Sequence, residues 1–325
     1  MLKPITIMGA NASGKTDLAL HIARLAGGEI ISADSKQIFT KLAAGTAKPS
    51  GEWRSYEDGT RTYYVEGIPY HLVDFADPMV TYDAGTYVSS AKKIMQEIIG
   101  RGHLPIIAGG TGMYIQSFWN GLDELPPANP EIRAELNLIA TEKGRAALHA
   151  ALEAIDPETA AKIPVNNVQR VIRAIEISRL AGRPASKVWS GKFFNTMPTK
   201  EGTFIFLKWK KEILQERIKE RTNRNFEAWE QETRQLLKEG YPCDCPGLRS
   251  LGYPEMLDYI RGIRPKKETI QLIVNVSLSY AKRQNTWFGR YRNINIMELS
   301  SPEEYNPEML AEELVRQEAH QNQPA

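Results

Sequence analysis

Gly9 to Thr16 is the stretch whose residue types and spacing most clearly indicate chemistry. Its sequence, GANASGKT, fits the pattern G-x-x-x-x-G-K-[ST], in which glycine lets the backbone curl until successive N–H groups point at phosphate oxygens. The β-prone run Ile5–Met8 precedes it, and Lys15–Leu25 is expected to form a helix with one apolar face. The positive helix end and the lysine favour anions. We therefore interpret the stretch as a site for a di- or triphosphate rather than as a chance match in a glycine turn.

Two further polar residues follow predicted strands and can join this site. Asp34 comes directly after the run Glu29–Ala33, and Thr111 lies in a Gly-Gly-Thr-Gly turn after the run Leu104–Ala108. Asp34 fits two roles equally well, a general base for a bound nucleophile or an acid that touches Mg²⁺ through water. Thr111 can contact phosphate or nucleophile, or it can cap a helix. Gln37 can hydrogen-bond a base edge or lie on the surface.

Arg217, Arg221 and Arg224 share one face of a predicted helix, because they are four and three residues apart. Together they can clamp a pyrophosphate from the side opposite Lys15. The equally supported alternative is a solvated charge stripe. In that case the positive charges would be balanced by the glutamates Glu212, Glu216 and Glu220.

Residues 281–292, AKRQNTWFGRYR, combine basic and aromatic side chains and contain no acid. This composition suits phosphate contacts together with stacking on unpaired bases. An amphipathic helix end with a buried aromatic residue explains it as well. His71 lies close to Asp74 and is expected to form a structural pair with it. A second group of basic and polar residues can hold a nucleic-acid backbone: Arg133, Gln169, Arg170 and Arg173.

The composition limits the class of protein. The 325 residues suffice for a large core and for two domains, or for one domain with an insertion. No apolar run approaches the roughly 20 residues of a membrane span, and Lys3-Pro4 leads into a strand without room for a signal peptide. Cys243 and Cys245 are too few for a structural zinc site and too close for a disulfide, so we expect free thiols in a reducing cytoplasm. The net charge of +2 requires any basic surface to be local.

Strands and helices alternate around these residues, which predicts an α/β fold with a P-loop NTPase-like parallel sheet covered on both faces. Since ligands lie at the carboxyl ends of such strands, the glycine loop, Asp34 and Thr111 should converge on one crevice. A helix is expected to end near Gly100. Residues 45–69 are rich in Gly, Pro and charge, so we expect a long loop with room for a small hairpin.

Only helical signals occur from about residue 120 to about residue 198, so a helical insertion is expected there. Helices should begin at Asn129-Pro130, with an end at Gly144, and at Asp156-Pro157, because a capping residue precedes proline at both places. Another helix should cover Val168–Leu180. A β-type run, Phe204–Leu207, then returns the chain to the sheet, and the remainder is expected to be mostly helical.

Taken together, these segments resemble the tRNA dimethylallyltransferase (tRNA isopentenyltransferase) family over roughly residues 3–295. The stretches that carry the resemblance occur in the family's order. They are Gly9–Thr16, Asp34–Gln37, Gly45–Pro49, Tyr70–Asp74, Gly109–Tyr114, Gln169–Glu176, Leu251–Tyr253 and Ala281–Trp287. The sequence departs from the family's usual pattern at Ala10-Asn11, Asn167-Val168 and Asn223–Asn225, and its stretch 50–69 is longer than usual.

The resemblance implies transfer of a dimethylallyl group from dimethylallyl diphosphate to N6 of adenosine 37 in the anticodon loop of tRNAs that read codons starting with U, with release of diphosphate. Asp34 would take the N6 proton, and Thr111 would orient the amine. Lys15, an arginine and Mg²⁺ held by Thr16 would stabilise the departing charge. We expect a cytoplasmic monomer that binds the tRNA anticodon stem-loop and no membrane.

The resemblance also implies two groups of site residues and four parts of the chain. Diphosphate contacts are expected from Gly9, Ala10, Asn11, Ala12, Ser13, Gly14, Lys15, Thr16, Arg217 and Arg221. Contacts to tRNA are expected from Asp34, Ser35, Lys36, Gln37, Thr111, Arg133, Gln169, Arg170, Arg173, Gly252, Tyr253, Lys282, Arg283, Gln284 and Trp287. The parts are 1–119 (P-loop α/β core), 120–198 (helical tRNA-binding insertion), 199–300 (second part of the core, with C-terminal helices) and 301–325 (a helix and a polar tail, disordered from about Ala319).

Three other functions match part of the pattern. Prenylation of free adenine nucleotides would need neither the basic and aromatic stretch nor the long helical insertion. A P-loop small-molecule kinase would transfer phosphate from ATP, with Asp34 mainly serving Mg²⁺. A non-catalytic RNA-binding protein would keep the phosphate cradle as a relic, and the intact Lys15, Thr16 and Asp34 argue against it.

Overall fold

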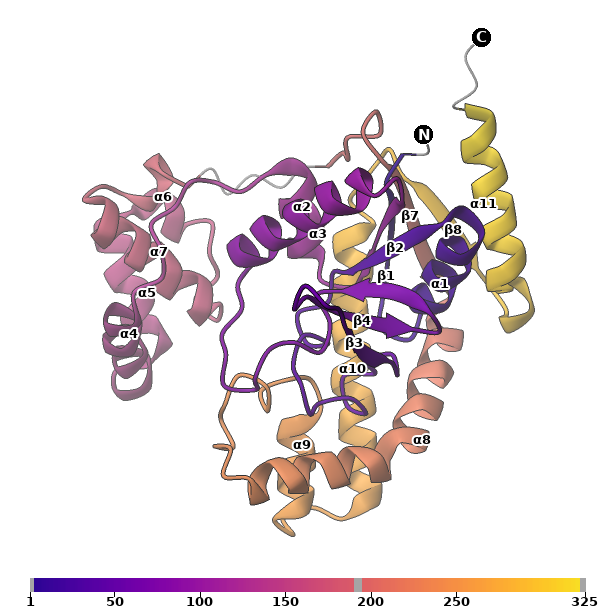
Figure 1. Cartoon of the computed structure of the whole chain (residues 1–325). Helices are drawn as coiled ribbons and strands as arrows, with labels where there is room; N and C mark the ends of the chain where they lie inside the picture. The colour runs from indigo at the N-terminus through magenta and orange to yellow at the C-terminus, as the bar shows by residue number, and fades with distance from the viewer. Residues whose placement is uncertain (1–2, 190–194, 322–325) are drawn as a thin grey trace. The chain divides into compact units, whose positions relative to one another are not determined.

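The computed structural model describes residues 3–189 and 195–321 (Figure 1). The strands within these residues are β1 (Ile5–Gly9), β2 (Gly28–Ser32), β3 (Glu52–Ser55), β4 (Arg61–Val65), β5 (Ile68–His71), β6 (Leu104–Gly109), β7 (Thr203–Trp209) and β8 (Asn295–Leu299). They form one sheet in the order β3-β4-β5-β2-β6-β1-β7-β8. The strands from β5 to β8 in this order run parallel, whereas β3, β4 and β5 pair antiparallel at one edge. The predicted α/β fold is confirmed.

Helices cover both faces of this sheet (Figure 1). The helices of the described residues, those of the smaller unit included, are α1 (Lys15–Ala26), α2 (Ala84–Gly100), α3 (Gly112–Asn120), α4 (Pro130–Glu142), α5 (Gly144–Ile155), α6 (Pro157–Ala160), α7 (Val168–Ala181), α8 (Lys211–Lys238), α9 (Tyr253–Ile260), α10 (Lys266–Phe288) and α11 (Pro307–Gln321). α1 packs beside α11 on one face, and α2 packs beside α3 on the other. Among the described residues, no helix has both the length and the apolar character of a membrane span.

The central strands position the residues of interest. β1, β2 and β6 are buried along their whole length, as expected for parallel strands covered by helices on both faces. The loops that follow them therefore emerge at the same edge of the sheet. The glycine loop follows β1, Asp34 follows β2 and Thr111 follows β6, so three segments that are far apart in sequence meet at this edge.

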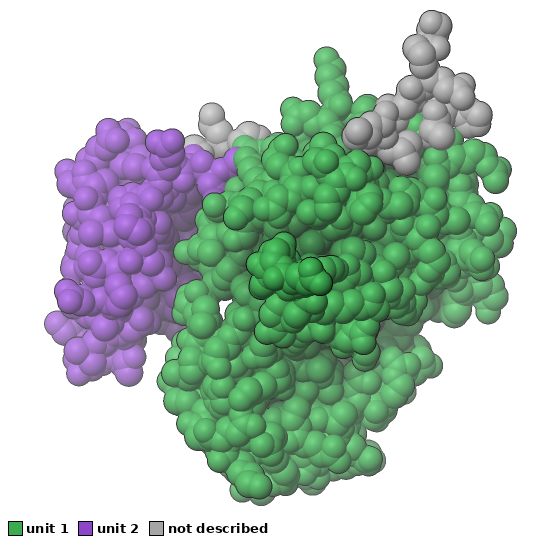
Figure 2. All heavy atoms as spheres, viewed as in Figure 1, with its two compact units in different colours: residues 1–120, 194–325 green, residues 121–193 purple. Residues whose placement is uncertain are grey.

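The chain divides into two compact units, which Figure 2 colours separately. The larger unit contains the sheet and comprises residues 1–120 and 194–325, and the smaller one comprises residues 121–193 with α4 to α7. The smaller unit has its own core, in which Leu136 of α4 and Ile175 of α7 are fully buried. Its helices therefore bury their apolar faces against one another, which accounts for the exclusively helical pattern of this segment.

The structure differs from the sequence-based expectations mainly at short elements. The elements β5, α5 and β8 are not predicted from the sequence. The two strands are missed because β5 includes Pro69 and because both strands depend on neighbouring strands for their hydrogen bonds. The hairpin expected within residues 45–69 is confirmed by the pairing of β3 with β4. α11 continues to Gln321, so the prediction of disorder from about Ala319 is wrong up to that residue. Residues 322–325 lie outside the described part of the chain.

Candidate functional site

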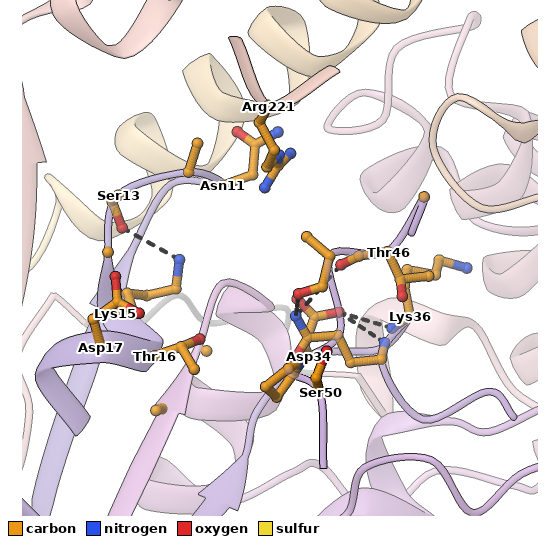
Figure 3. A pocket seen from close by; sticks show the side chains of 18 of the residues that line it. Asn11, Ser13, Lys15, Thr16, Asp17, Asp34, Lys36, Thr46, Ser50 and Arg221 are labelled. Carbon is orange, nitrogen blue, oxygen red and sulfur yellow. Dashed lines mark hydrogen bonds between the residues drawn. The ribbon is translucent and has the colours of Figure 1, made fainter. Parts of the chain in front are cut away.

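A cleft of about 600 Å³ lies where the glycine loop, the segment after β2 and the N-terminal half of α8 meet. Figure 3 shows Lys15 and Arg221 pointing into the space between the glycine loop and Asp34. The expectation that the glycine loop, Asp34 and Thr111 share one crevice is confirmed for the loop and Asp34, whereas Thr111 lines a second hollow. The residues that line the cleft include Asn11, Ala12, Ser13, Gly14, Lys15, Thr16, Asp34, Lys36, Gln37, Gly45, Arg217, Arg221, Arg224 and Tyr280.

The glycine loop turns tightly between β1 and α1. Ala12 and Gly14 have positive φ angles of 61° and 92°, a conformation that favours glycine. A Cβ atom at Gly14 would also lie only 2.5 Å from the Tyr305 side chain. The loop therefore needs glycine at position 14 for two reasons, its backbone angle and the aromatic ring packed against it.

Lys15, the first residue of α1, is fixed over the loop. Its Nζ atom donates to the Ala10 carbonyl over 2.6 Å and to the Ser13 hydroxyl over 3.3 Å. Burial lowers the pKa of Lys15 to about 8, with Asp34 acting against this shift and Arg221 adding to it. The lysine is therefore a cation held in a place where positive charge is destabilised, and a bound anion would relieve that effect.

The arginines of α8 also line the cleft. Burial lowers the pKa of Arg221 to about 10, Asp34 opposes this, and Arg224 and Arg217 add to it. Within residues 3–189 and 195–321 no carboxylate forms an ion pair with Arg217 or Arg221, so the alternative of a charge stripe balanced by glutamates is wrong for both. Arg217 donates through Nε to the Ala12 carbonyl over 2.8 Å, and it thus supports the loop directly.

Asp34 lines the cleft, and Thr111 is held next to it. One carboxylate oxygen of Asp34 accepts hydrogen bonds from the backbone N–H groups of Lys36 (2.8 Å) and Gln37 (3.3 Å). This turn fixes the carboxylate and leaves its second oxygen for another partner. The Thr111 hydroxyl accepts a hydrogen bond from the Ser35 N–H group over 3.0 Å. The acid and the hydroxyl are therefore positioned by one short backbone segment.

Tyr280 of α10 is a residue of this site that the sequence analysis does not identify. It lines the cleft, and its hydroxyl lies close to the Thr111 side chain. Burial raises its pKa, and the negative charge of Asp34 adds to this effect. The available signal was its helical phase, because Tyr280 lies one turn before Gln284 on the same helix.

Thr16 and Asp34 offer oxygen atoms of the kind that Mg²⁺ prefers. The Thr16 side chain lies close to the buried Tyr70 hydroxyl. In the described residues no group of three or more His, Cys, Asp or Glu side chains is arranged to hold a metal. The cleft therefore fits an ion that takes one or two protein oxygens and completes its shell with phosphate and water, as Mg²⁺ commonly does.

A second hollow, of about 370 Å³, begins at Ser35, Lys36 and Thr111. Unstacked bases bind to aromatic and apolar surfaces of this kind, whereas phosphates bind to the cationic cleft. The segment Asp34–Lys36 thus separates a site suited to phosphate from one suited to a base. The apolar and aromatic residues that line the hollow are Ile38, Phe39, Val80, Tyr82, Met113 and Tyr114.

Gln284 and Gln37, two of the expected tRNA contacts, use their side-chain amides inside the protein. Gln284 is only 5% exposed, accepts a hydrogen bond from the Asn11 N–H group and donates to the Gly110 carbonyl, both over 2.8 Å. Gln37 donates to the Ala47 carbonyl over 3.0 Å. We therefore expect both to position the loops around the cleft rather than to contact RNA.

The loop Gly45–Pro49 is held by Glu232 of α8, which the sequence does not mark as special. The Glu232 carboxylate accepts hydrogen bonds from the backbone N–H groups of residues 43–45, at 2.8–2.9 Å, and from the Tyr253 hydroxyl at 2.5 Å. The Tyr253 side chain is also fully buried. At Gly252 a Cβ atom would lie 2.2 Å from a tryptophan ring. The expected tRNA contacts at 252 and 253 are therefore packing positions in this structure.

The basic end of α10 combines exposed and packed residues. Lys282 and Arg283 are exposed and are available for contacts with phosphate. Trp287 packs against Gly112, where a Cβ atom would approach its ring to 2.4 Å, and its indole N–H donates to the Tyr291 hydroxyl over 3.2 Å. Trp287 is thus the packed aromatic residue of an amphipathic helix end. Lys282 and Arg283 remain candidates for contacts with phosphate.

His71 does not pair with Asp74, so that expectation is wrong. Its Nε2 atom lies 2.6 Å from the carboxylate of Glu29, which is almost fully buried in β2. Asp74 instead pairs with Lys48 and accepts a hydrogen bond from the Trp53 indole over 3.0 Å. Both pairs hold β5 and the loop that follows it, and neither contains a lining residue of the cleft.

In the smaller unit, Arg133 and Arg173 bind the protein's own Glu176. The Glu176 side chain is fully buried, and its oxygens lie 2.8 Å from Arg133 Nε and 2.5 Å from Arg173 Nη1. Burial alone would raise the pKa of Glu176, but hydrogen bonds from the two arginines outweigh it and hold the pKa below its usual value. Arg170 differs, because its guanidinium stacks 5.1 Å from the Trp189 ring centre. Gln169 is exposed.

Comparisons with known proteins agree with this geometry. A family model described as IPP transferase matches residues 37–292, and one described as isopentenyl transferase matches residues 3–68. A tRNA dimethylallyltransferase of Elusimicrobium minutum is 45% identical over 290 residues, 89% of this chain and 92% of the relative. One of Myxococcus xanthus is 40% identical over 286 residues, 87% of this chain and 88% of the relative. The crystal structure of the full-length tRNA isopentenylpyrophosphate transferase of Bacillus halodurans is similar with a TM-score of 0.67 and 31% identity, covering 98% of this chain and 96% of that chain.

Proposed function

Since the chain belongs to the tRNA dimethylallyltransferase family, we propose that its cleft transfers the dimethylallyl group of dimethylallyl diphosphate to N6 of adenosine 37 in the tRNA anticodon loop. Diphosphate is the second product. Family membership follows from the IPP transferase match over residues 37–292 and from the 45% identity to a curated relative. The protein is accordingly an enzyme, a tRNA prenyltransferase. The acceptors are tRNAs that read codons starting with U.

The observation that supports this function most directly is the distribution of charge across the cleft. Lys15 and Arg221 are half-buried cations whose pKa values burial lowers, and they stand on the phosphate-loop side. Asp34 faces them with a carboxylate oxygen that its own turn does not use. A diphosphate neutralises the cations, and a nucleophile placed between the diphosphate and Asp34 has a base within reach.

The residues support one concerted substitution. Adenine N6 is a poor nucleophile because its lone pair is delocalised into the ring, so Asp34 takes the N6 proton as the bond to the allylic carbon forms. Thr111, held through Ser35, orients the amine. The carbon–oxygen bond to diphosphate breaks, and its electron pair leaves with the diphosphate. Lys15, Arg221 and the N–H groups of the loop stabilise the negative charge that develops there.

We propose Mg²⁺ as the cofactor. Thr16 would hold it beside the phosphate loop, where the Thr16 side chain lines the cleft. When bound, the ion supplies additional positive charge against the leaving diphosphate.

The acceptor base enters from the aromatic hollow beside Thr111. Unstacking a base costs a few kcal/mol and costs least in a loop, which suits an anticodon loop. Exposed residues of both units are available for the tRNA backbone: Lys282, Arg283, Gln169 and Arg170. We further propose that the enzyme works as a monomer in the cytoplasm.

The test is prenyl transfer by an Asp34→Ala variant. A general base contributes roughly 10²- to 10⁴-fold to a rate, so turnover should fall by about that factor while tRNA affinity stays nearly intact. Mass spectrometry of tRNA nucleosides after incubation with Mg²⁺ and dimethylallyl diphosphate measures the product. Asp34→Asn is the matched variant, since its amide oxygen still accepts the Lys36 N–H bond but takes up no proton.

Unchanged turnover in both variants would remove Asp34 as the base. Absence of alkylated adenine with the unmodified enzyme, combined with phosphorylation of a hydroxyl compound from ATP, would replace the proposed reaction by that of a P-loop kinase. Binding of tRNA without either reaction would point to the non-catalytic alternative.

A further inference from the structure

Three successive carbonyl groups of the phosphate loop are each bound by a side chain from a different element. These three side-chain bonds are additional to the loop's internal backbone hydrogen bonds, which are those of a tight turn and of the first turn of α1. The pairs are the Ala12 carbonyl with Arg217 Nε of α8 (2.8 Å), the Ser13 carbonyl with Trp209 Nε1 of β7 (2.9 Å) and the Gly14 carbonyl with the Tyr305 hydroxyl (2.6 Å).

Fixing these carbonyls fixes the direction of the N–H groups. In a planar trans peptide, the carbonyl of one residue and the N–H of the next point to opposite sides. The Ser13 carbonyl held by Trp209 therefore directs the Gly14 N–H away from Trp209. The Gly14 carbonyl held by Tyr305 directs the Lys15 N–H in the same manner. These N–H groups belong to residues that line the cleft, where a phosphate is expected to accept from them.

Tyr305 is the least expected of the three donors. It lies between β8 and α11, beyond residues 37–292 of the family match. Its ring centre lies 5.6 Å from that of Trp209, and the Arg217 guanidinium lies 5.6 Å from the Tyr305 ring. The ring also occupies the space next to Gly14, where a Cβ atom would come within 2.5 Å. Burial raises the pKa of Tyr305, so the hydroxyl stays protonated and able to donate.

The segment around Tyr305 is itself anchored to the phosphate-loop helix. A short turn places the residue, with the Tyr305 N–H donating to the Pro302 carbonyl over 3.2 Å. The helix that follows, α11, packs along α1, which begins at the loop. Ala311 and Leu314 of α11 are buried in the same core as α1. The hydroxyl is therefore presented to the loop from a fixed support.

We propose that Tyr305 is a positioning residue for the diphosphate donor. It holds the Gly14–Lys15 peptide so that its N–H group faces the phosphate, and the C-terminal segment 300–321 thereby belongs to the donor site. The role of this site in prenyl transfer rests on the proposed function, whereas the binding of diphosphate by the loop does not depend on it.

The experiment compares Tyr305→Phe with Tyr241→Phe in the full-length protein. Tyr241 also donates a 2.6 Å hydroxyl hydrogen bond, to the exposed Asp77, so its variant removes an equivalent bond outside the cleft. Titration calorimetry measures the Kd of inorganic diphosphate, and steady-state kinetics measures KM for dimethylallyl diphosphate and for tRNA. Losing one hydrogen bond should weaken diphosphate binding about three- to tenfold. KM for the donor should rise similarly, and KM for tRNA should stay unchanged.

A second variant, Tyr305→Leu, also removes the ring and should weaken diphosphate binding more than Tyr305→Phe does. Parent-like diphosphate affinity in both Tyr305 variants overturns the proposal. Equal losses in Tyr305→Phe and Tyr241→Phe, together with equal falls in Tm, also overturn it, because the effect would then be one of general stability. Diphosphate affinity is read without any acceptor, so failure of the prenyl-transfer assay leaves this result interpretable.

Discussion

Two helices of this protein carry arginines at helical spacing, and the structure uses them in opposite ways. On α8, Arg217, Arg221 and Arg224 line a cleft, and no carboxylate in the described part of the chain pairs with Arg221. On α7, Arg173 pairs with Glu176, whose side chain is fully buried. The first group keeps positive charge available for a ligand. Arg173 on α7 is instead neutralised by the protein itself.

The difference lies in the origin of the counter-charge rather than in the number of arginines. Burial lowers the pKa of Arg221 to about 10, so the folded protein holds this cation at some energetic disadvantage. Glu176 shows the reverse, because its hydrogen bonds to Arg133 and Arg173 hold its pKa below the usual value despite burial. A run of arginines therefore indicates an anion site only where the chain supplies no acid to meet it.

Arg221→Met should give the largest effect. Charge-assisted hydrogen bonds contribute about 1.5–3 kcal/mol, so affinity for dimethylallyl diphosphate should fall by roughly 10- to 150-fold. Methionine keeps an unbranched apolar stem and removes only the guanidinium. The free energy of unfolding should not decrease, because the substitution also removes a positive charge that lowers the pKa of Lys15. Titration calorimetry and chemical denaturation measure the two quantities.

Arg173→Met is the matched control, because it makes the same change on the neutralised helix. Its affinity for dimethylallyl diphosphate should equal that of the parent. Equal loss of affinity in both variants, or no loss in Arg221→Met, would show that the two groups of arginines do not differ in the way described.

The effect of Arg173→Met should appear in stability instead. It leaves Glu176 buried with fewer partners, Arg133 and the Asn129 N–H group, and weakening such a network costs about 1–3 kcal/mol. Hydrogen exchange of α4 and α7 should accelerate correspondingly, while exchange in the sheet stays unchanged. Parent-like exchange in α7 would mean that Arg133 alone satisfies the buried carboxylate.

The sequence predicts the fold and the phosphate loop because both depend on local pattern. The glycine loop needs one strand, one turn and one helix start, and all three are encoded within residues 5–25. The short strands β5 and β8 have no comparable signal, since their hydrogen bonds come from strands far away in the chain.

The roles of individual site residues are harder to predict, because they depend on partners that are distant in sequence. Arg133 meets Glu176 across 43 residues, and Gln284 meets Asn11 across 273 residues. Before folding, Arg133 and Gln284 look like surface residues that could bind RNA. In the structure their polar groups are already satisfied. The spacing of Arg173 three residues before Glu176 is the one local signal that favours a structural pair.

The pH dependence of donor binding tests whether Arg221 of α8 keeps its positive charge available in the cleft. Only protonated Lys15 contributes charge, and its pKa in the free protein is lowered to about 8. Affinity for dimethylallyl diphosphate should therefore be constant below this pKa and fall as the pH rises through it, by about tenfold between pH 7 and pH 9. The fall should begin at higher pH in Arg221→Met, because Arg221 contributes to lowering this pKa. Calorimetric titrations across this range measure both curves, and a flat profile in the parent would contradict the assignment.

Arg170→Met should give the smallest effect, and it tests the rule within α7 itself. Arg170 is exposed, stacks on Trp189 and has no acid partner within the described residues, so its charge is available although it lies one turn from the neutralised Arg173. Affinity for an anticodon stem-loop should fall by about two- to fivefold, and the slope of log affinity against log salt should become shallower by about one. Fluorescence anisotropy at several salt concentrations measures this, with Arg173→Met as the control whose slope stays unchanged. The same slope in the two variants would mean that a paired and an unpaired arginine contribute equally to RNA binding. The absence of an acid partner would then no longer distinguish a ligand-binding arginine from a structural one.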